Sequence, residues 1–437
     1  MRPGTRCPVV KIEYIDENNK KQTIECYDDD GYSKCLLAIA NELDVFVPSK
    51  SNQIEMLHFE KPSLRVCAEL LKERELQLYE CRLILLIHLL TDAEELLELF
   101  SQTNIDIYFI LGKPFSFNKE VLQNIKKKFK NVDIQPYDVY DKTDYIDRLL
   151  QNAYQQSSID KKSIVIFEVG GYFHKALAHM PHHFTEYIKG VVEVTTFGHT
   201  KYIAEVENIP IPVYSIARSL IKSIEARYVG RAAVMAIDKI FREQGVSTAG
   251  RTALVIGFGM IGKSVADSLR SNNYIVSVFD TKSYAKLDAF TLGYKIGSKQ
   301  ELLRNADIIF SATAQQSLSY EEMMSCKDHA VLVSVGSRGG EFDVQGLVTH
   351  AINEPRLCGQ YITKYKLNNG KTIVLIRNGE AVNFVIQSCP DEIVDMIHAE
   401  MLICGEMILR NQGRIGIINE ASETDLNRIA RLWLKNI

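Results

Sequence analysis

The chain has 437 residues, of which 46% are hydrophobic and 24% are charged, and its formal net charge is −4. These proportions are typical of a globular protein, and the length predicts two domains because one hydrophobic core rarely serves so long a chain. The slightly negative charge gives no electrostatic basis for binding nucleic acid. The apolar runs, such as residues 83–90, are too short to span a membrane, and no hydrophobic signal region follows Met1. We therefore expect a cytoplasmic protein.

The first elements are a hairpin and then alternating strands and helices. Residues 11–27 alternate between apolar and polar around a polar turn, which predicts a β-hairpin. Further on, strands are expected at 83–87, 105–111 and 132–134, with helices at 93–100 and 119–129 between them. This alternation predicts a parallel sheet. His88 directly follows the first of these strands, and Thr91 and Glu94 then have the spacing of a helix capping box.

The next elements prepare a cleft. Residues 163–167 form a predicted strand ahead of Gly170 and Gly171, and a short extended segment at 191–194 precedes Thr195 and Thr196. Since the carboxyl ends of parallel strands meet at one edge of a sheet, these turns are expected to face a ligand. A long amphipathic helix at 219–241 then leads into the following unit, where it could serve as a hinge.

The most informative motif is a GxGxxG loop made by Gly257, Gly259 and Gly262 between a predicted strand at 251–256 and a helix at 264–270. The glycines permit a tight turn, close approach to a pyrophosphate and close packing of helix on strand. Met260 and Ile261 open the helix, whose free amides meet phosphate charge. A second strand, 274–279, ends in Asp280, where a carboxylate accepts hydrogen bonds from the adenosine ribose and repels a 2′-phosphate. The motif predicts NAD in preference to NADP.

Strands at 308–310, 331–335 and 372–376 and helices at 391–409 and 420–434 complete the expected elements. The fold class is α/β, with two domains of doubly wound parallel sheet. We expect an N-terminal extension with its hairpin at 1–80, a substrate-type domain at 81–226 completed by 386–437, and a Rossmann domain at 227–385 inserted into it.

Cysteines and histidines give no metal site. The nine cysteines include no CxxC pair, which predicts reduced buried thiols, with Cys35 and Cys404 in the core. Half of the histidines gather in one segment, but their spacing matches no zinc pattern, so we expect contacts with substrate or partner and no bound metal. These are His174, His179, His182, His183 and His199.

Five segments together resemble the adenosylhomocysteinase family in order and spacing. They begin at Val192, Ser219, Gly257, Ala306 and Asn378, and the similarity spans about residues 83–434. The resemblance implies a substrate domain and an NAD domain joined by hinges. It also implies a cycle in which NAD oxidises a ribose 3′-hydroxyl, the 5′-thiol is eliminated, water adds and the hydride returns.

The same resemblance implies site residues. His88 matches the acid/base histidine of the family, Lys222 matches the lysine that helps remove the hydroxyl proton, and Glu193 is retained from its glutamate pair. A solvated helix lysine is the alternative for Lys222. Cofactor contacts are expected at residues of the glycine loop and at five further positions. These are Gly257, Gly259, Met260, Ile261, Gly262, Asp280, Thr195, Thr196, Thr313 and Asn383.

Other family positions have changed. The second of the paired aspartates is Val169, the second glutamate is Val194, and the aspartate beyond the lysine is Ala226. The two family histidines of the cofactor half correspond to Ser337 and Cys389. Because each lost general base typically costs a factor of about 10² to 10⁴, ordinary adenosylhomocysteine hydrolysis is not expected without replacements. Glu168, Glu225 or Arg227 could redirect recognition, and Arg227 could clamp an anion.

Three functions remain open. The favoured one is an NAD-dependent enzyme acting on a hydroxyl of a nucleoside-like substrate, in a homo-oligomer that we expect to be a dimer. The second is an inactive protein that senses NAD or a nucleoside. The third is a simple NAD-dependent dehydrogenase, because this scaffold hosts many chemistries.

Overall fold

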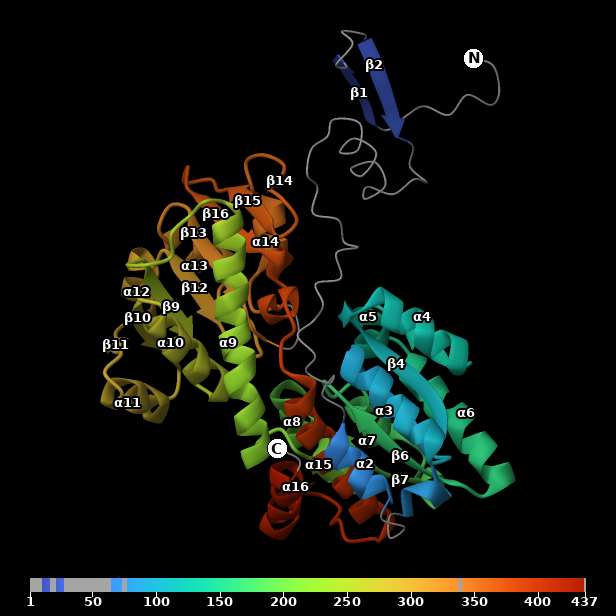
Figure 1. Ribbon diagram of the computed structural model, residues 1–437. Coiled ribbons are helices and arrows are strands. Elements are labelled where there is room, and N and C mark those ends of the chain that lie inside the picture. The colour runs from blue at the N-terminus through green and yellow to red at the C-terminus, as the bar shows by residue number, and fades with distance from the viewer. Residues whose placement is uncertain (1–9, 16–20, 27–63, 73–76, 337–339, 436–437) are drawn as a thin grey trace. The chain divides into compact units, whose positions relative to one another are not determined.

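The computed structural model describes residues 10–15, 21–26, 64–72, 77–336 and 340–435 (Figure 1). The chain divides into two compact units, residues 1–62 and 63–437. In the first unit, β1 (Val10–Ile15) and β2 (Lys21–Cys26) pair antiparallel along their whole length. The predicted hairpin strands are confirmed. Cys35 and Tyr27 lie outside the described residues.

A seven-stranded sheet occupies one part of the second unit, in the order β17-β8-β7-β6-β3-β4-β5, and every pair in it is parallel. Its central strands are almost wholly buried, as expected for a parallel sheet with both faces covered. The strands are β3 (Cys81–Leu89), β4 (Asp106–Phe117), β5 (Val132–Ile134), β6 (Ser163–Glu168), β7 (Ile188–Glu193), β8 (Val213–Ser215) and β17 (Ile418–Asn419).

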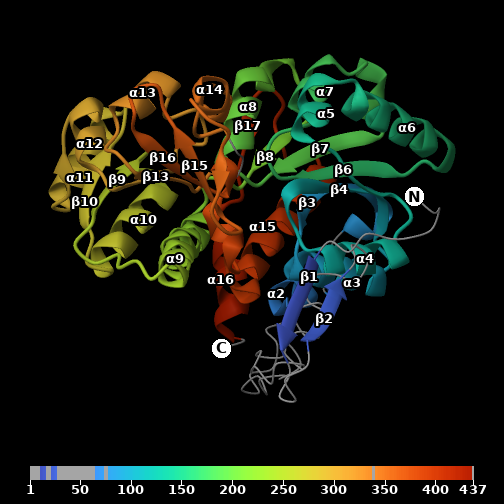
Figure 2. The same ribbon diagram turned by 90° about the horizontal axis from the view of Figure 1, so that it is seen from above.

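Helices cover both faces of this sheet (Figure 2). Two separate apolar cores result, one on each face. The first core is formed with α2 (Arg65–Lys72), α3 (Thr91–Gln102), α4 (Lys119–Lys128), α15 (Asp391–Leu409) and α16 (Glu423–Lys435). The second is formed with α5 (Tyr137–Lys142), α6 (Tyr145–Asp160), α7 (His174–His179) and α8 (Thr196–Glu205). Short 3₁₀ turns are η2 (Gln77–Glu80), η3 (His182–Glu186) and η4 (Val206–Asn208).

An eight-stranded sheet forms the other part, in the order β11-β10-β9-β12-β13-β16-β15-β14. The first six strands in this order, which end with β16, are parallel to one another. Strand β15 runs antiparallel to both of its neighbours, β16 and β14. The predicted doubly wound parallel sheet is confirmed, with an antiparallel edge at β15 that the sequence did not indicate. The strands are β9 (Thr252–Ile256), β10 (Ile275–Phe279), β11 (Lys295–Ile296), β12 (Ile308–Ser311), β13 (Ala330–Ser334), β14 (Arg356–Leu357), β15 (Ile362–Lys366) and β16 (Thr372–Ile376).

This sheet is also covered on both faces, again with one apolar core on each. One core is formed with α9 (Leu220–Glu243), α10 (Met260–Ser271) and α11 (Ser283–Thr291), and the other with α12 (Lys299–Asn305), α13 (Tyr320–Ser325) and α14 (Val344–His350). Two 3₁₀ turns, η5 (Arg377–Gly379) and η6 (Val382–Val385), follow β16. Cys404 is fully buried in α15, as predicted. None of the described helices is both long and apolar enough to cross a membrane.

Candidate functional site: a dinucleotide crevice and a polar cluster

The glycine loop lies where the order of the eight-stranded sheet reverses, because β9 has β10 on one side and β12 on the other. Such a switch point leaves a crevice outside the carboxyl ends of the strands. Gly257 has a φ of +90°, and a Cβ there would lie 2.7 Å from the carbonyl oxygen of Ala312. A Cβ on Gly262 would lie only 1.8 Å from the carbonyl oxygen of Gly257, whereas a Cβ on Gly259 would meet open space. The surroundings of the three glycines thus fit the three separate roles that the motif predicts.

Asp280 organises this loop from the end of β10. Its carboxylate accepts hydrogen bonds from the amides of Phe258, at 2.7 Å, and of Lys282, at 2.8 Å. Each carboxylate oxygen has more than one lone pair, so the half-buried group can still accept bonds from ribose hydroxyls. The position therefore suits the role predicted for it.

The other residues of the crevice also fit a dinucleotide. Met260 and Ile261 open α10, and in the part of the chain that the structure describes no side chain caps this helix. Its amino-terminal amides therefore suit a phosphate. The Nδ2 atom of Asn383 donates to Ser388 at 2.7 Å, but its buried Oδ1 atom has no hydrogen-bond partner among the described residues. A buried amide oxygen without a partner is costly, and a bound ligand that donates to it would remove that cost.

His88 lies at the end of β3 and faces the segment that contains Asn383. Its Nδ1 atom is 2.6 Å from the hydroxyl of Ser116, and its ring centroid is 5.3 Å from that of Phe384 in η6. Burial lowers the pKa of His88 well below its usual value, and the positive charges of Lys113 and Lys222 lower it further. His88 is therefore a neutral imidazole at neutral pH.

Lys222 lies in the first turn of α9, close enough to His88 to affect its titration. Its ammonium group forms an ion pair with Glu225 at 2.9 Å, and both side chains are largely buried. Ser219 caps the helix by accepting from the amide of Lys222, and its hydroxyl donates to Glu400 of α15 at 2.8 Å. Burial raises the pKa of Glu400 to about 7. Lys222 is thus held between carboxylates and is not a solvated surface lysine.

Glu193 is fully buried at the end of β7, and its carboxylate forms hydrogen bonds with two loops. It accepts hydrogen bonds from the amides of Gly170 and Gly171 and from both the amide and the hydroxyl of Thr195, at 2.6 to 3.1 Å. These contacts are typical of a residue that holds loops in position. The catalytic role predicted for Glu193 stays a prediction that this geometry does not favour.

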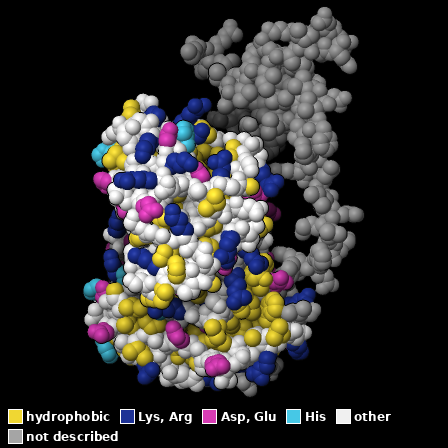
Figure 3. Space-filling model, turned by 90° about the vertical axis from the view of Figure 1, so that its left-hand side faces the viewer, with side chains coloured by type: hydrophobic (Ala, Val, Ile, Leu, Met, Phe, Trp, Pro, Cys, Tyr) yellow, Lys and Arg dark blue, Asp and Glu magenta, His cyan; other side chains and the backbone are white. Residues whose placement is uncertain are grey.

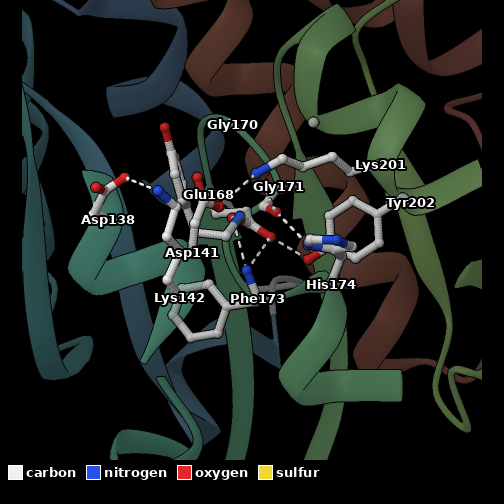
Figure 4. A network of polar contacts seen from close by, with 12 residues as sticks. Asp138, Asp141, Lys142, Glu168, Gly170, Gly171, Phe173, His174, Lys201 and Tyr202 are labelled. Atoms are coloured by element: carbon white, nitrogen blue, oxygen red, sulfur yellow. Dashed lines mark hydrogen bonds and ion pairs between the residues drawn. The ribbon is translucent and has the colours of Figure 1, made fainter. Parts of the chain in front are cut away.

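Glu168 ends the neighbouring strand β6 and anchors the same turn (Figure 4). It accepts hydrogen bonds from the amides of Tyr172 and Phe173 and from the hydroxyl of Tyr202. Burial, together with the nearby charge of Glu193, raises the pKa of Glu168 to about 8. Both carboxylates therefore hold the turn after β6 in position.

The changed family positions are apolar and buried. Val169, Val194 and Cys389 belong to one core cluster on the α15 face of the sheet, and Ala226 is 2% exposed in α9. The valine and alanine side chains cannot accept a proton, and burial raises the pKa of Cys389 and so keeps it a neutral thiol. Ser337 lies outside the described residues.

Two other predicted sites are used for local structure. Thr195 is the N-cap of α8, accepting from the amide of Gly198, whereas Thr196 is exposed in its first turn.

The prediction of a capping box at Thr91 is wrong. The N-cap of α3 is Leu90, which makes no side-chain cap, and the hydroxyl of Thr91 instead donates to Asp391 in α15. Tertiary pairing has displaced the local bond.

The clustered histidines have separate partners. The Nδ1 atom of His174 lies 2.7 Å from the carbonyl oxygen of Gly171, and that of His199 lies 2.9 Å from the hydroxyl of Ser215. Across the described ranges, no group of three or more histidine, cysteine or acidic side chains is arranged to hold a metal ion.

Arg227 is exposed and lines a groove between α9 and α10 with a volume of about 700 Å³, together with Arg231 and Lys263.

The sequence did not single out Lys113, which is fully buried in β4 with its ammonium group near the rings of Tyr137 and Tyr172. The sequence signal that could have identified Lys113 is a single lysine directly after the apolar part of this strand.

Comparisons with known proteins find similarity to adenosylhomocysteinases. The model of the S-adenosyl-L-homocysteine hydrolase NAD-binding domain matches residues 227–389. The adenosylhomocysteinase of Sulfolobus acidocaldarius is 26% identical over 355 residues, which cover 80% of this chain and 82% of that protein. That of Thermotoga maritima is 25% identical over 80% of this chain and 86% of its own length. That of Saccharolobus solfataricus is 31% identical over 46% of this chain and 49% of its own length.

Two solved dehydrogenase structures also align. A glyoxylate reductase from Paecilomyes thermophila is 14% identical with a TM-score of 0.41, covering 77% of this chain and 98% of its own. D-lactate dehydrogenase from Escherichia coli is 13% identical with a TM-score of 0.41, covering 76% of this chain and 98% of its own.

Proposed function

Because the chain is a divergent member of the adenosylhomocysteinase family and has its NAD-binding domain, we propose that it uses bound NAD to oxidise a hydroxyl of a nucleoside-like substrate. The observation that carries this proposal is that His88 lies beside Phe384 of η6, the turn that contains Asn383, and within range of the charge of Lys222. Bound NAD would supply the hydride acceptor. Gly257, Gly259 and Asp280 would hold it.

Lys222 would remove the hydroxyl proton as a neutral amine, after its ammonium group had passed a proton to Glu225, with which it is paired at 2.9 Å. His88 would handle a second proton, because its lowered pKa leaves it neutral and able to accept one. Ser116 would keep the ring in a single orientation through its contact with Nδ1.

The later steps of the family reaction have less support. Val169, Val194 and Ala226 provide no carboxylate that could activate water or hold ribose hydroxyls. We therefore propose that the reaction differs from ordinary adenosylhomocysteine hydrolysis and includes elimination, epimerisation or simple dehydrogenation of a related substrate.

A nucleoside panel tests this proposal. The purified protein is denatured to identify released nucleotide by mass spectrometry, and fresh protein is then mixed with each nucleoside while absorbance of reduced nicotinamide is followed. We expect stoichiometric NAD and a reduction signal with at least one nucleoside. If the protein released no nucleotide and no nucleoside gave a reduction signal, the proposal of an NAD-dependent enzyme would be overturned.

Lys222→Ala should lower the rate of this reduction by about 10² or more while leaving bound NAD unchanged. Lys239→Ala is the matched control, because Lys239 lies on the same helix and is exposed. An equal rate in both variants would exclude Lys222 from proton transfer.

A second function is favoured by the apolar replacements themselves. With Val169 and Val194 in the core, a protein that binds NAD or a nucleoside without turnover would keep its cofactor site while losing its acids. Multiple turnovers on any nucleoside would dismiss this sensor function. Reduced nicotinamide that accumulates and is not reoxidised would instead indicate a simple dehydrogenase.

A further inference from the structure

Glu341 is a buried carboxylate that neither the motif nor the proposed reaction uses. Its side chain is 1% exposed, and it accepts hydrogen bonds from the hydroxyls of Ser311 and Thr313 and from the amides of Thr313 and Ala314. The distances to the Thr313 hydroxyl and the Ala314 amide are 2.6 and 2.8 Å. One carboxylate thus fixes the whole turn that leaves β12.

That turn forms one wall of the dinucleotide crevice. The amide of Ala312 donates to the carbonyl oxygen of Ile256 at 2.9 Å, and a Cβ on Gly257 would lie 2.7 Å from the carbonyl oxygen of Ala312, so the glycine loop and the turn after β12 lie side by side. Ala314 has a φ of +59°, a strained value for a residue with a Cβ, and the bond from its amide to Glu341 helps to hold it. The carboxylate is also fitted closely to the end of β13, because a Cβ on Gly336 would lie 2.4 Å from its Oε1 atom.

The arrangement of the crevice decides which part of the dinucleotide this wall meets. Asp280, at the end of β10, is the group suited to the adenosine ribose. The ends of β12 and β13 lie on the opposite side of β9 and therefore face the nicotinamide half. The nicotinamide ring is a cation when oxidised and neutral when reduced.

We propose that Glu341 is a positioning residue for the nicotinamide half and that its buried negative charge makes the crevice prefer oxidised NAD over NADH. The hydroxyl and amide donors stabilise the carboxylate form, although burial raises the pKa of Glu341. An anion in a poorly solvated wall acts on a nearby charge more strongly than it would in water. The proposal rests on cofactor binding alone and is independent of which substrate is oxidised.

The test measures dissociation constants for NAD and NADH separately, by equilibrium dialysis against the full-length protein stripped of nucleotide. Glu341→Gln keeps the size of the side chain and removes its charge. We expect the affinity for NAD to fall about tenfold relative to that for NADH. Glu301→Gln, on the exposed surface of α12, is the matched control and should change neither constant.

Glu341→Asp keeps the charge but shortens the reach to the turn. It should weaken binding of both forms while leaving their ratio near that of the unaltered protein, which also covers the case in which Glu341→Gln fails to fold. An equal loss of affinity for both forms in Glu341→Gln would overturn the proposal. An altered ratio in Glu341→Asp as large as in Glu341→Gln would overturn it too. If the nucleoside panel gives no reduction while these ratios behave as expected, only the proposed reaction fails.

Discussion

At the scale of single residues, buried carboxylates have two different uses in this protein. Glu168 and Glu193 hold loops by accepting several hydrogen bonds each. Glu225 instead forms an ion pair with Lys222, the proposed base. The sequence alone could not separate these uses. The sequence singled out Glu193 because it matches a retained glutamate of the family that the chain resembles, but the number of amides that surround a carboxylate depends on how loops fold back.

Glu168 should make stability depend on pH. Its folded pKa of about 8 lies above the usual value of 4.5, so the stability linked to the protonated group is fully present below about pH 4.5 and is lost as pH rises through about 8. Between pH 5 and pH 8, urea unfolding should show the protein losing roughly 3 to 4 kcal/mol relative to Glu168→Gln. Glu186→Gln, an exposed control, should keep the original dependence. A constant difference between the protein and Glu168→Gln would contradict the assignment.

At the scale of elements, long apolar or strongly periodic segments were predictable. The strands at 132–134 and 372–376 and the helix at 391–409 have the predicted bounds, and β9 and α9 differ from theirs by one or two residues. Polar or very short elements were missed, including α6 and the two-residue strands β11 and β14. Their stability comes from tertiary contacts, which local patterns do not record.

The glycine loop yields a paired prediction at this scale. Gly259→Ala should leave the free energy of unfolding within about 0.5 kcal/mol, because its Cβ meets open space and its φ is −79°, yet NAD affinity should fall by about tenfold or more. Gly262→Ala should destabilise the fold by roughly 2 kcal/mol, since its Cβ would collide with backbone. Urea unfolding and nucleotide titration of both variants provide the measurements. Equal stability of the two variants would contradict this division of roles.

At the scale of the whole molecule, the sequence predicted two α/β sheets and an NAD domain, and the structure and the family match support them. The predicted domain boundaries, the cytoplasmic location and the homo-oligomer stay predictions. Hydrophobic side chains gather in the lower part of the face shown in Figure 3, and a group of exposed apolar side chains of this kind often marks a protein contact. Residues that face a second chain cannot be recognised from periodicity, because they resemble core residues.

We expect a dimer in solution. Light scattering coupled to size-exclusion chromatography should give twice the 49.6 kDa mass of one chain. The measurement should be repeated over a tenfold range of protein concentration, with the NAD-free and NAD-loaded protein compared as matched samples. A mass of one chain at every concentration in both samples would show that the exposed apolar side chains do not mediate self-association.

Helix α9 joins the two halves of the candidate site mechanically. It has 24 residues and is therefore about 36 Å long. Lys222 lies in its first turn, and farther along it packs against α10, where Gly230 leaves no room for a Cβ beside Ser264 and the hydroxyl of Ser264 donates to the carbonyl oxygen of Arg227. Helix α10 begins at the glycine loop, so α9 contacts, partway along its length, the helix that would bind the cofactor phosphates, and Lys222 lies at the amino-terminal end of α9. We expect that a small tilt of α9 at this contact would displace Lys222 by a larger distance, so that binding in the crevice would change the position of the proposed base.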